Sequence, residues 1–352
     1  MTDTPYLAVD LPRLDRNLQA VAELARNAHV DLRPHAKTHK TAELARRQID
    51  SGAVGLTVAT IGEAEAFADA GVSDLFVAYP LWVNAHKGSR LRALADRVAL
   101  RLAVDSVAGA TRLAAELPGA EVLVEVDSGQ HRTGVAPASA GEVAVAAQSA
   151  GLDVVGVFTF PGHGYGPGHA RSDAAAQEIT ALATAAERLR DKGIEPRVRS
   201  GGSTPTIEFA ASGVLTEIRP GVYPFYDAQQ VELGVCGFDD VALTAVSTVV
   251  HRDGRRVVLD AGSKIIGADR PAWASGHGRI LDEPDARIVA LSEHHAVVEY
   301  PDENTPELGS TVRVVPNHVC TAVNLVDELV VGGGDDGGAV PTWRVSARGA
   351  NS

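Results

Sequence analysis

Short apolar runs alternate with alanine-rich amphipathic segments over about the first two-thirds of the chain. Between the runs, apolar residues recur at spacings of three and four, which is typical of amphipathic helices. Such strand–helix units in series predict parallel strands joined by right-handed crossovers. The predicted strands are Val30–Pro34, Gly55–Ala59, Leu75–Tyr79, Ala99–Val104, Val122–Val126, Val154–Thr159, Pro196–Ser200 and Leu215–Arg219. The predicted helices are Thr41–Asp50, Gly62–Ala70, Ala85–Ala95, Val107–Leu117, Ala138–Ala150 and Ala170–Lys192.

Two architectures are compatible with this order of elements, a (β/α)8 barrel and a doubly wound sheet. No GxGxxG motif follows the first strand, which disfavours a dinucleotide-binding sheet. We therefore predict an α/β protein whose N-terminal part is a (β/α)8 TIM barrel. The functional groups of such a barrel gather at the carboxyl ends of its strands. The polar residues at those ends are Lys37, Thr60, Tyr79, Asp105, Asp127, Arg132, His163, Tyr165, Ser203, Thr204, Arg219 and Tyr223.

The pattern changes after about Pro224. Segments such as "RIVALSEHHAVVEY" alternate valine with polar residues, and "RDGR" contains a strong hairpin dipeptide. We predict that residues 11–225 form the barrel. Residues 226–352 are predicted to form a second, mainly antiparallel β domain, which residues 1–10 could join. The segment "VGGGDDGGAV" (331–340) is either a flexible linker or a hairpin loop, and the strand-like "PTWRV" after it favours the loop.

The overall charge narrows the class of partner. The chain of 352 residues has a formal net charge of −13, which disfavours nonspecific binding to nucleic acid or to anionic membranes. No apolar run approaches the roughly 20 residues of a membrane-spanning helix. The opening "MTDTPYLAVD" lacks the layout of a secretory signal, and two cysteines are too few for a disulfide framework. We expect a cytoplasmic protein.

Lys37 lies in "DLRPHAKTHK", directly behind the first predicted strand. In an enclosed site, burial and nearby cations would lower the pKa of this amine, which could then condense with an aldehyde. A lysine whose ammonium group extends to water is the alternative.

A second candidate is "RSGGSTPT", at the end of the seventh predicted strand. Gly201 and Gly202 allow the backbone to turn its N–H groups inward, Ser203 and Thr204 add hydroxyl donors, and Pro205 suits the first position of a short helix whose N-terminus attracts phosphate. Barrels often hold phosphate at this place, although a plain capped loop has the same sequence. A lysine and a phosphate site together suggest pyridoxal phosphate.

Two further segments add candidate chemistry. In "EVDSGQHRTGV", Arg132 could approach the cofactor's pyridine nitrogen and keep it unprotonated, or it could pair with Asp127. In "VPNHVC", His318 and Cys320 stand two apart, so on a strand both would point to the same face. An imidazole and a thiolate are suitable zinc ligands, but a buried cysteine beside a surface histidine has the same spacing.

These motifs together resemble the fold-type III pyridoxal-phosphate enzymes related to alanine racemase, and within them the branch of D-serine dehydratase and D-threonine aldolase. The resemblance covers nearly the whole chain. Its segments are "TPYLAVDLPRLDRNL", "RPHAKTHK", "TVATIGEAEAFADAGVSDLFVAYP", "EVDSGQHRTGV", "GGSTPT", "RPGVYPFYD", "LDAGSK" and "VPNHVC".

The resemblance assigns roles to particular residues. It implies that Lys37 carries the cofactor and that Arg132 lies on its pyridine side. His163 and Tyr165 in "FPGHGYG" are expected to line the substrate side as catalytic residues together with Lys37, and Tyr165 is also expected to contact the cofactor. The expected phosphate contacts are Gly202, Ser203, Thr204 and Tyr223, and the expected metal ligands are His318 and Cys320. It also implies a homodimer that acts on a D-amino acid as its small-molecule substrate.

The resemblance leaves two reactions open. Dehydration of D-serine to pyruvate and ammonia is favoured because "GGSTPT" resembles the dehydratase phosphate loop, and because Cys320 stands where aldolases typically have an acidic residue. A thiolate suits Zn²⁺ over the Mn²⁺ or Mg²⁺ of the aldolases. The alternative is D-threonine aldolase, which yields glycine and acetaldehyde.

Two other classes of protein are compatible with parts of the sequence. The first is a noncatalytic pyridoxal-phosphate-binding protein, which the additional β domain disfavours. The second is a barrel enzyme that uses the glycine-rich loop to bind a sugar phosphate or nucleotide.

Overall fold

The computed structural model describes residues 3–332 and 341–352, and their contacts divide the chain into two compact units. The first unit comprises the described parts of Met1–Gln19, Thr38–Glu43 and Val222–Gly349. The second comprises Ala20–Lys37, Leu44–Gly221 and Ala350–Ser352. Two helices, α1 (Leu11–Ala28) and α2 (Ala42–Asp50), contain boundaries between the units. The predicted loop at 331–340 lies largely outside the described residues.

The second unit is the predicted parallel barrel, and its eight strands follow the order β2-β9-β8-β7-β6-β5-β4-β3. After β2 the chain bridges to β3 through His35 and Thr57, which joins the two edges. Apolar side chains such as Leu75, Leu123 and Val157 are fully buried. The strands are β2 (Asp31–Leu32), β3 (Leu56–Val58), β4 (Asp74–Pro80), β5 (Ala99–Val104), β6 (Glu121–Glu125), β7 (Asp153–Phe158), β8 (Val198–Gly201) and β9 (Glu217–Ile218).

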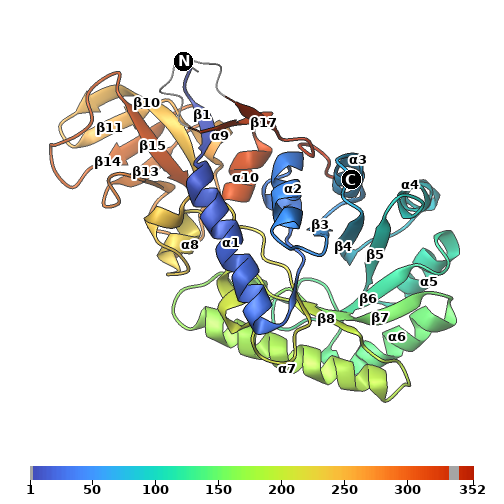
Figure 1. Ribbon diagram of the computed structural model, residues 1–352. Coiled ribbons are helices and arrows are strands. Elements are labelled where there is room, and N and C mark those ends of the chain that lie inside the picture. Colours follow the sequence, from blue (N-terminus) through green and yellow to red (C-terminus); the bar gives the residue numbers. More distant parts are fainter. Residues whose placement is uncertain (1–2, 333–340) are drawn as a thin grey trace. The chain divides into compact units, whose positions relative to one another are not determined.

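Helices connect these strands and cover their outer face (Figure 1). Thr60, Asn84 and Ser106 begin three of them as N-caps, since each side chain accepts a hydrogen bond from a backbone N–H of the first turn. Gly156 allows β7 and β8 to approach, because a Cβ there would lie 1.9 Å from the carbonyl oxygen of Val198. The helices are α3 (Ile61–Asp69), α4 (Ala85–Ala95), α5 (Val107–Glu116), α6 (Ala140–Ser149) and α7 (Ala170–Arg190).

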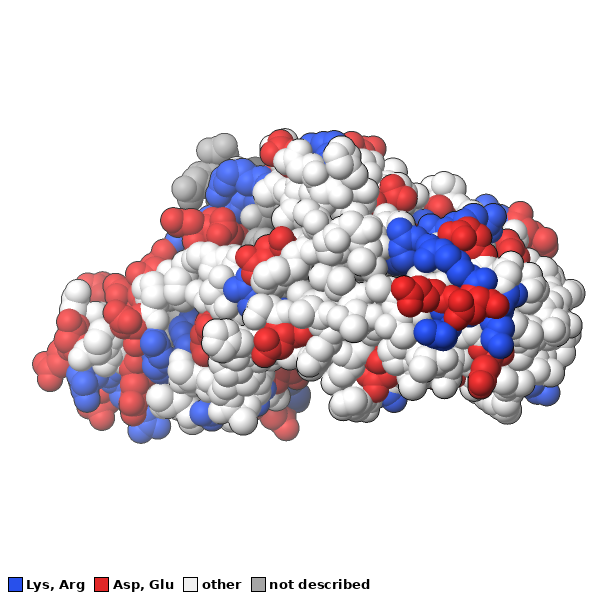
Figure 2. Space-filling view, turned by 90° about the horizontal axis from the view of Figure 1, so that it is seen from below, with Lys and Arg blue, Asp and Glu red and all other residues white. Residues whose placement is uncertain are grey.

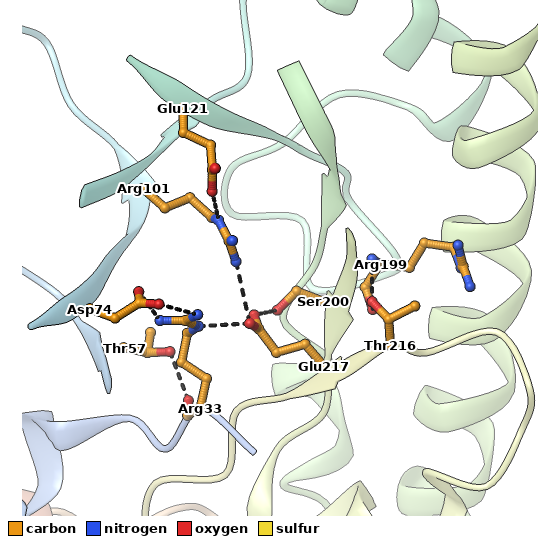
Figure 3. Close-up of polar contacts among 9 residues, drawn as sticks. All are labelled: Arg33, Thr57, Asp74, Arg101, Glu121, Arg199, Ser200, Thr216 and Glu217. Atoms are coloured by element: carbon orange, nitrogen blue, oxygen red, sulfur yellow. Dashed lines mark hydrogen bonds and ion pairs between the residues drawn. The ribbon is translucent and has the colours of Figure 1, made fainter. Parts of the chain in front are cut away.

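A network of charged side chains fills part of the barrel interior (Figure 3). Arg33 lies between Asp74 and Glu217, and Arg101 lies between Glu121 and Glu217. Asp74 and Glu121 are the first residues of β4 and β6, so the network is close to the amino ends of these strands. This end of a barrel usually contributes to stability rather than to catalysis.

The first unit contains the predicted β domain, a mainly antiparallel sheet in the order β11-β14-β13-β12-β15-β10-β1-β16-β17. Strand β10 also pairs with β11, and their tight turn has Gly254 at φ +55°, as the sequence "RDGR" predicts. The strands are β1 (Tyr6–Val9), β10 (Leu243–Asp253), β11 (Arg256–Leu259), β12 (Gly278–Ile280), β13 (Arg287–Leu291), β14 (Ala296–Glu299), β15 (Thr311–Pro316), β16 (Glu328–Val331) and β17 (Thr342–Arg344). The short helices are α8 (Ala228–Glu232), α9 (Ser263–Ile266) and α10 (Val319–Asn324).

The expectation that His318 and Cys320 share one face of a strand is wrong. Strand β15 ends at Pro316, His318 is the N-cap of α10, and Cys320 lies in the first turn of that helix. The cause is a partner distant in sequence, because the backbone N–H of Val319 donates to the side chain of Asp227 and not to a neighbouring strand.

The surface agrees with the mixed composition of the chain. Acidic and basic side chains are interspersed over the face drawn in Figure 2. Among the described residues, no helix combines the length and the apolar character that crossing a membrane would require.

Candidate functional site

Lys37 lies in a single 3₁₀ turn, Ala36–Thr38, that follows β2 at the carboxyl end of the barrel. The N–H of His35 donates to the carbonyl oxygen of Pro220, which fixes the chain just before this turn. The side chain of Lys37 is half-buried, and its Nζ lies 5.5 Å from the centroid of the Phe160 ring. The amine therefore faces an aromatic ring that follows β7.

Arg132 approaches the same ring, with its Cζ 5.4 Å from the Phe160 centroid. The loop that carries it is held by Asp127, whose carboxylate accepts hydrogen bonds from the backbone N–H groups of Gly129 and His131 and contacts Nδ1 of His131 at 2.7 Å. Burial raises the pKa of Asp127, but these hydrogen bonds outweigh it and leave the pKa below its ordinary value. The partner of Asp127 is thus His131, while Arg132 extends toward Phe160.

Tyr165 and His163 come from the segment after β7. The Tyr165 ring centroid is 6.4 Å from that of Phe160. Nε2 of His163 is 2.8 Å from Oε1 of Gln177, and its buried Nδ1 has no hydrogen-bond partner within the described part of the chain. The structure therefore brings Lys37, Arg132 and Tyr165 together around Phe160, a residue that the sequence analysis did not single out although it begins "FPGHGYG".

The "GGSTPT" segment forms the end of β8 and a 3₁₀ helix, Thr204–Phe209. Ser203 caps this helix, and its N–H donates to Oγ1 of Thr206 at 2.9 Å. Gly202 has φ +76°, and its N–H donates to Oε1 of Glu178 at 2.7 Å, so this N–H faces a carboxyl group and not an open cup. Ser203 and Thr204 are buried in this unit, while Tyr223 belongs to the other unit.

A buried arginine and two buried acids lie beneath this loop. The guanidinium of Arg219 stacks near Phe158 and Phe76 and donates to the carbonyl oxygen of Thr159. Burial raises the pKa of Glu125 and of Glu178 to about 7 in each case. Burial also lowers the pKa of Arg219, and the negative charges of nearby glutamates offset part of this decrease.

We expect Glu178 to affect how stability depends on pH. Its raised pKa means that between about 4.5 and 7 the folded state holds a proton that the unfolded state has lost. Glu178 therefore lowers the free energy of unfolding as the pH rises through this window, by up to about 1.4 kcal/mol per pH unit. Glu178→Gln should remove this part of the slope in urea unfolding from pH 5 to 8. An unchanged slope would show that Glu178 is ionised in the fold.

His318 and Cys320 lie together in the other unit, at the start of α10. Nδ1 of His318 is 3.6 Å from Oδ2 of Asp227, and Sγ of Cys320 is 3.2 Å from Oγ1 of Thr38. The negative charge of the Cys320 thiolate, with Asp227, raises the pKa of His318 to about 11 despite its burial. An imidazole beside a thiolate suits a divalent zinc ion. Within residues 3–332 and 341–352, no third His, Cys, Asp or Glu completes a cluster that could hold a metal, so a metal at this pair would need further ligands.

The chain is similar to known proteins over nearly all of its length. Residues 9–229 match the model of the alanine racemase N-terminal domain, and residues 242–332 match that of a putative serine dehydratase domain. The chain is 35% identical to a D-threonine aldolase of Arthrobacter sp., over 99% of this chain and 93% of the relative. It is 33% identical to the D-threo-3-hydroxyaspartate dehydratase of Delftia sp., over 90% of this chain and 91% of the relative.

A solved structure supports the same relationship. It is a cysteine-to-alanine variant of D-threo-3-hydroxyaspartate dehydratase in the metal-free form. It superposes with a TM-score of 0.89 and 31% identity and covers 98% of this chain and 97% of the other. The chain therefore belongs to the fold-type III pyridoxal-phosphate enzymes, in the group that joins an alanine racemase N-terminal domain to a serine dehydratase domain.

Proposed function

We propose that this protein is a pyridoxal-phosphate- and zinc-dependent lyase that removes water from D-3-hydroxy amino acids, with D-serine as the expected substrate and pyruvate and ammonia as products. The names of two relatives, a D-threonine aldolase and a D-threo-3-hydroxyaspartate dehydratase, support the substrate class. The observation that carries the choice of dehydration is the pair of His318 and Cys320, because a thiolate ligand suits zinc rather than manganese or magnesium.

The barrel residues fit the cofactor. Lys37 offers an amine next to an aromatic ring, and Ser203 and Thr204 offer buried hydroxyls at the start of a 3₁₀ helix. Pyridoxal phosphate, when bound, withdraws electrons from the α-carbon of an attached amino acid. In our proposal Lys37 holds the cofactor and moves the α-proton on its Nζ, while Arg132 lies against the pyridine side.

The other proposed contacts follow from the same unit. His163 and Tyr165 would line the substrate side, since Tyr165 lies near Phe160 and the buried Nδ1 of His163 is unpartnered among the described residues. A zinc ion held by His318 and Cys320 would act as a Lewis acid that stabilises the departing hydroxide.

A second candidate reaction is the aldol cleavage of D-threonine to glycine and acetaldehyde. The identity of 35% to a D-threonine aldolase over 99% of this chain favours it. In that reaction the Cα–Cβ bond breaks after the substrate hydroxyl loses its proton, and Mn²⁺ or Mg²⁺ would be the expected metal.

One experiment separates the two reactions. The purified protein, loaded with pyridoxal phosphate and Zn²⁺, is incubated with D-serine and with D-threonine, and the products are resolved by chromatography. We expect a keto acid and ammonia. Glycine with an aldehyde would establish the aldolase instead, and bound cofactor without any product would indicate a noncatalytic binding protein.

Cys320→Ala should weaken zinc binding while the cofactor remains bound, because the variant loses one of two proposed protein ligands. Zinc content after dialysis, measured by atomic emission, should fall severalfold relative to the wild type, with the cofactor absorbance unchanged. Cys236→Ala is the matched control, since Cys236 is the other cysteine of the chain. Equal zinc content in both variants would remove the reason to prefer dehydration.

We also expect a homodimer, as in the family that the sequence resembles. Light scattering on the purified protein should give twice the mass of the chain, and a monomer at micromolar concentration would contradict this expectation.

A further inference from the structure

Asp227 is a fully buried carboxylate in the unit that contains His318 and Cys320. It is the N-cap of α8, where its Oδ1 accepts a hydrogen bond from the N–H of Gln230 at 3.0 Å. Its other oxygen, Oδ2, accepts from the N–H of Val319, the first residue of α10, at 3.1 Å. One carboxylate thus links the starts of two helices.

Oδ2 also lies 3.6 Å from Nδ1 of His318. The cap of α8 uses only Oδ1. The contacts of Oδ2 with Val319 and His318 are therefore additional to the cap. A buried carboxylate at this place favours a hydrogen on Nδ1, and the nitrogen that then remains for a metal is Nε2. Carboxylates in this position orient metal-binding histidines and make them more basic ligands.

We propose that Asp227 is a positioning residue for the metal site: it holds the ring of His318 so that Nε2 is the ligand nitrogen. This inference rests on the proposed zinc site of His318 and Cys320. Asp227 does not bind the ion, and its effect reaches the metal through the imidazole.

The test is the zinc affinity of full-length Asp227→Asn with pyridoxal phosphate bound, measured by competition with a chromogenic chelator. Loss of the charge should weaken zinc binding about 10- to 100-fold, with the cofactor absorbance unchanged. The matched control is Asp269→Asn, because Asp269 accepts a hydrogen bond from Thr321, next to Cys320, at 2.7 Å. A role confined to capping α8 would lower the melting temperature and leave the zinc affinity at the wild-type value, which would overturn the proposal.

A second measurement needs no variant. In a crystal structure of the zinc-loaded wild type, Nε2 of His318 should bind the ion and Nδ1 should lie within hydrogen-bonding distance of Asp227. Coordination through Nδ1 would overturn the role of Asp227 while leaving the zinc site intact. A wild-type protein that binds no zinc would overturn the metal site itself, and the role of Asp227 with it.

Discussion

Lys37→Ala should abolish covalent binding of pyridoxal phosphate and reduce turnover of D-3-hydroxy amino acids by about 10³-fold or more. The expected effect is large because one amine has two proposed tasks, to hold the cofactor and to move the α-proton. Lys40, three residues further along, donates to Oδ1 of Asn324 at 2.8 Å, so this neighbouring amine is already engaged. The visible absorbance of the bound cofactor, which makes the purified protein yellow, measures the loss of covalent binding when it is recorded before and after borohydride reduction.

The matched control for Lys37 is Lys87→Ala, which removes a lysine at the start of α4 in the same unit. It should leave both cofactor binding and turnover unchanged. Peptide mapping of the reduced wild-type protein should place the cofactor's mass on the peptide that contains Lys37. Persistence of the yellow band in Lys37→Ala, or a labelled peptide elsewhere, would contradict the assignment and the proposed reaction with it.

Much of the barrel could be predicted because its signal is local. Alternating strands and helices need only the spacing of apolar residues, and all eight predicted strands overlap strands of the structure. The hairpin at "RDGR" is equally local, since a glycine with positive φ fixes the turn.

The site could be predicted only in part, because its partners are distant in sequence. A lysine after β2 and an arginine after β6 meet at Phe160, and nothing near any of the three indicates this ring as the meeting point. The strand expected at His318 fails for the same reason. The N–H that would have continued the ladder is taken by Asp227, whose position depends on the packing of α8.

The buried charge network is the clearest case of a feature without a sequence signal. Arg33 and Glu217 are far apart in the chain, and each looks like an ordinary strand-end residue. Only closure of the barrel places them against each other. Their role is accordingly best tested through stability, and not through chemistry.

Glu217→Gln should lower the free energy of unfolding by about 3 kcal/mol or more, the usual cost of breaking a buried ion pair by removing one partner. Glu217 accepts a hydrogen bond from Nε of Arg33 at 2.6 Å, and the guanidinium of Arg101 lies 3.3 Å away. Glutamine is similar in size but leaves the buried guanidinium of Arg33 and the partly buried one of Arg101 without this negative charge. Urea unfolding at pH 7 measures the difference.

The control and the pH dependence make this prediction specific. Glu121→Gln removes the other partner of Arg101, but that carboxylate is partly exposed, so the expected loss is below about 1 kcal/mol. Burial raises the pKa of Glu217, and the charges of Arg33 and Arg101 outweigh it, so its folded pKa lies below the ordinary value of 4.5. The stabilisation is therefore complete above about pH 4.5 and is lost as the pH falls through the folded pKa. The difference in free energy of unfolding between wild type and Glu217→Gln should accordingly decrease as the pH falls below about 4.5. A difference that is small at pH 7, or that stays constant down to pH 3, would show that the network depends on the shape of Glu217 and not on its charge.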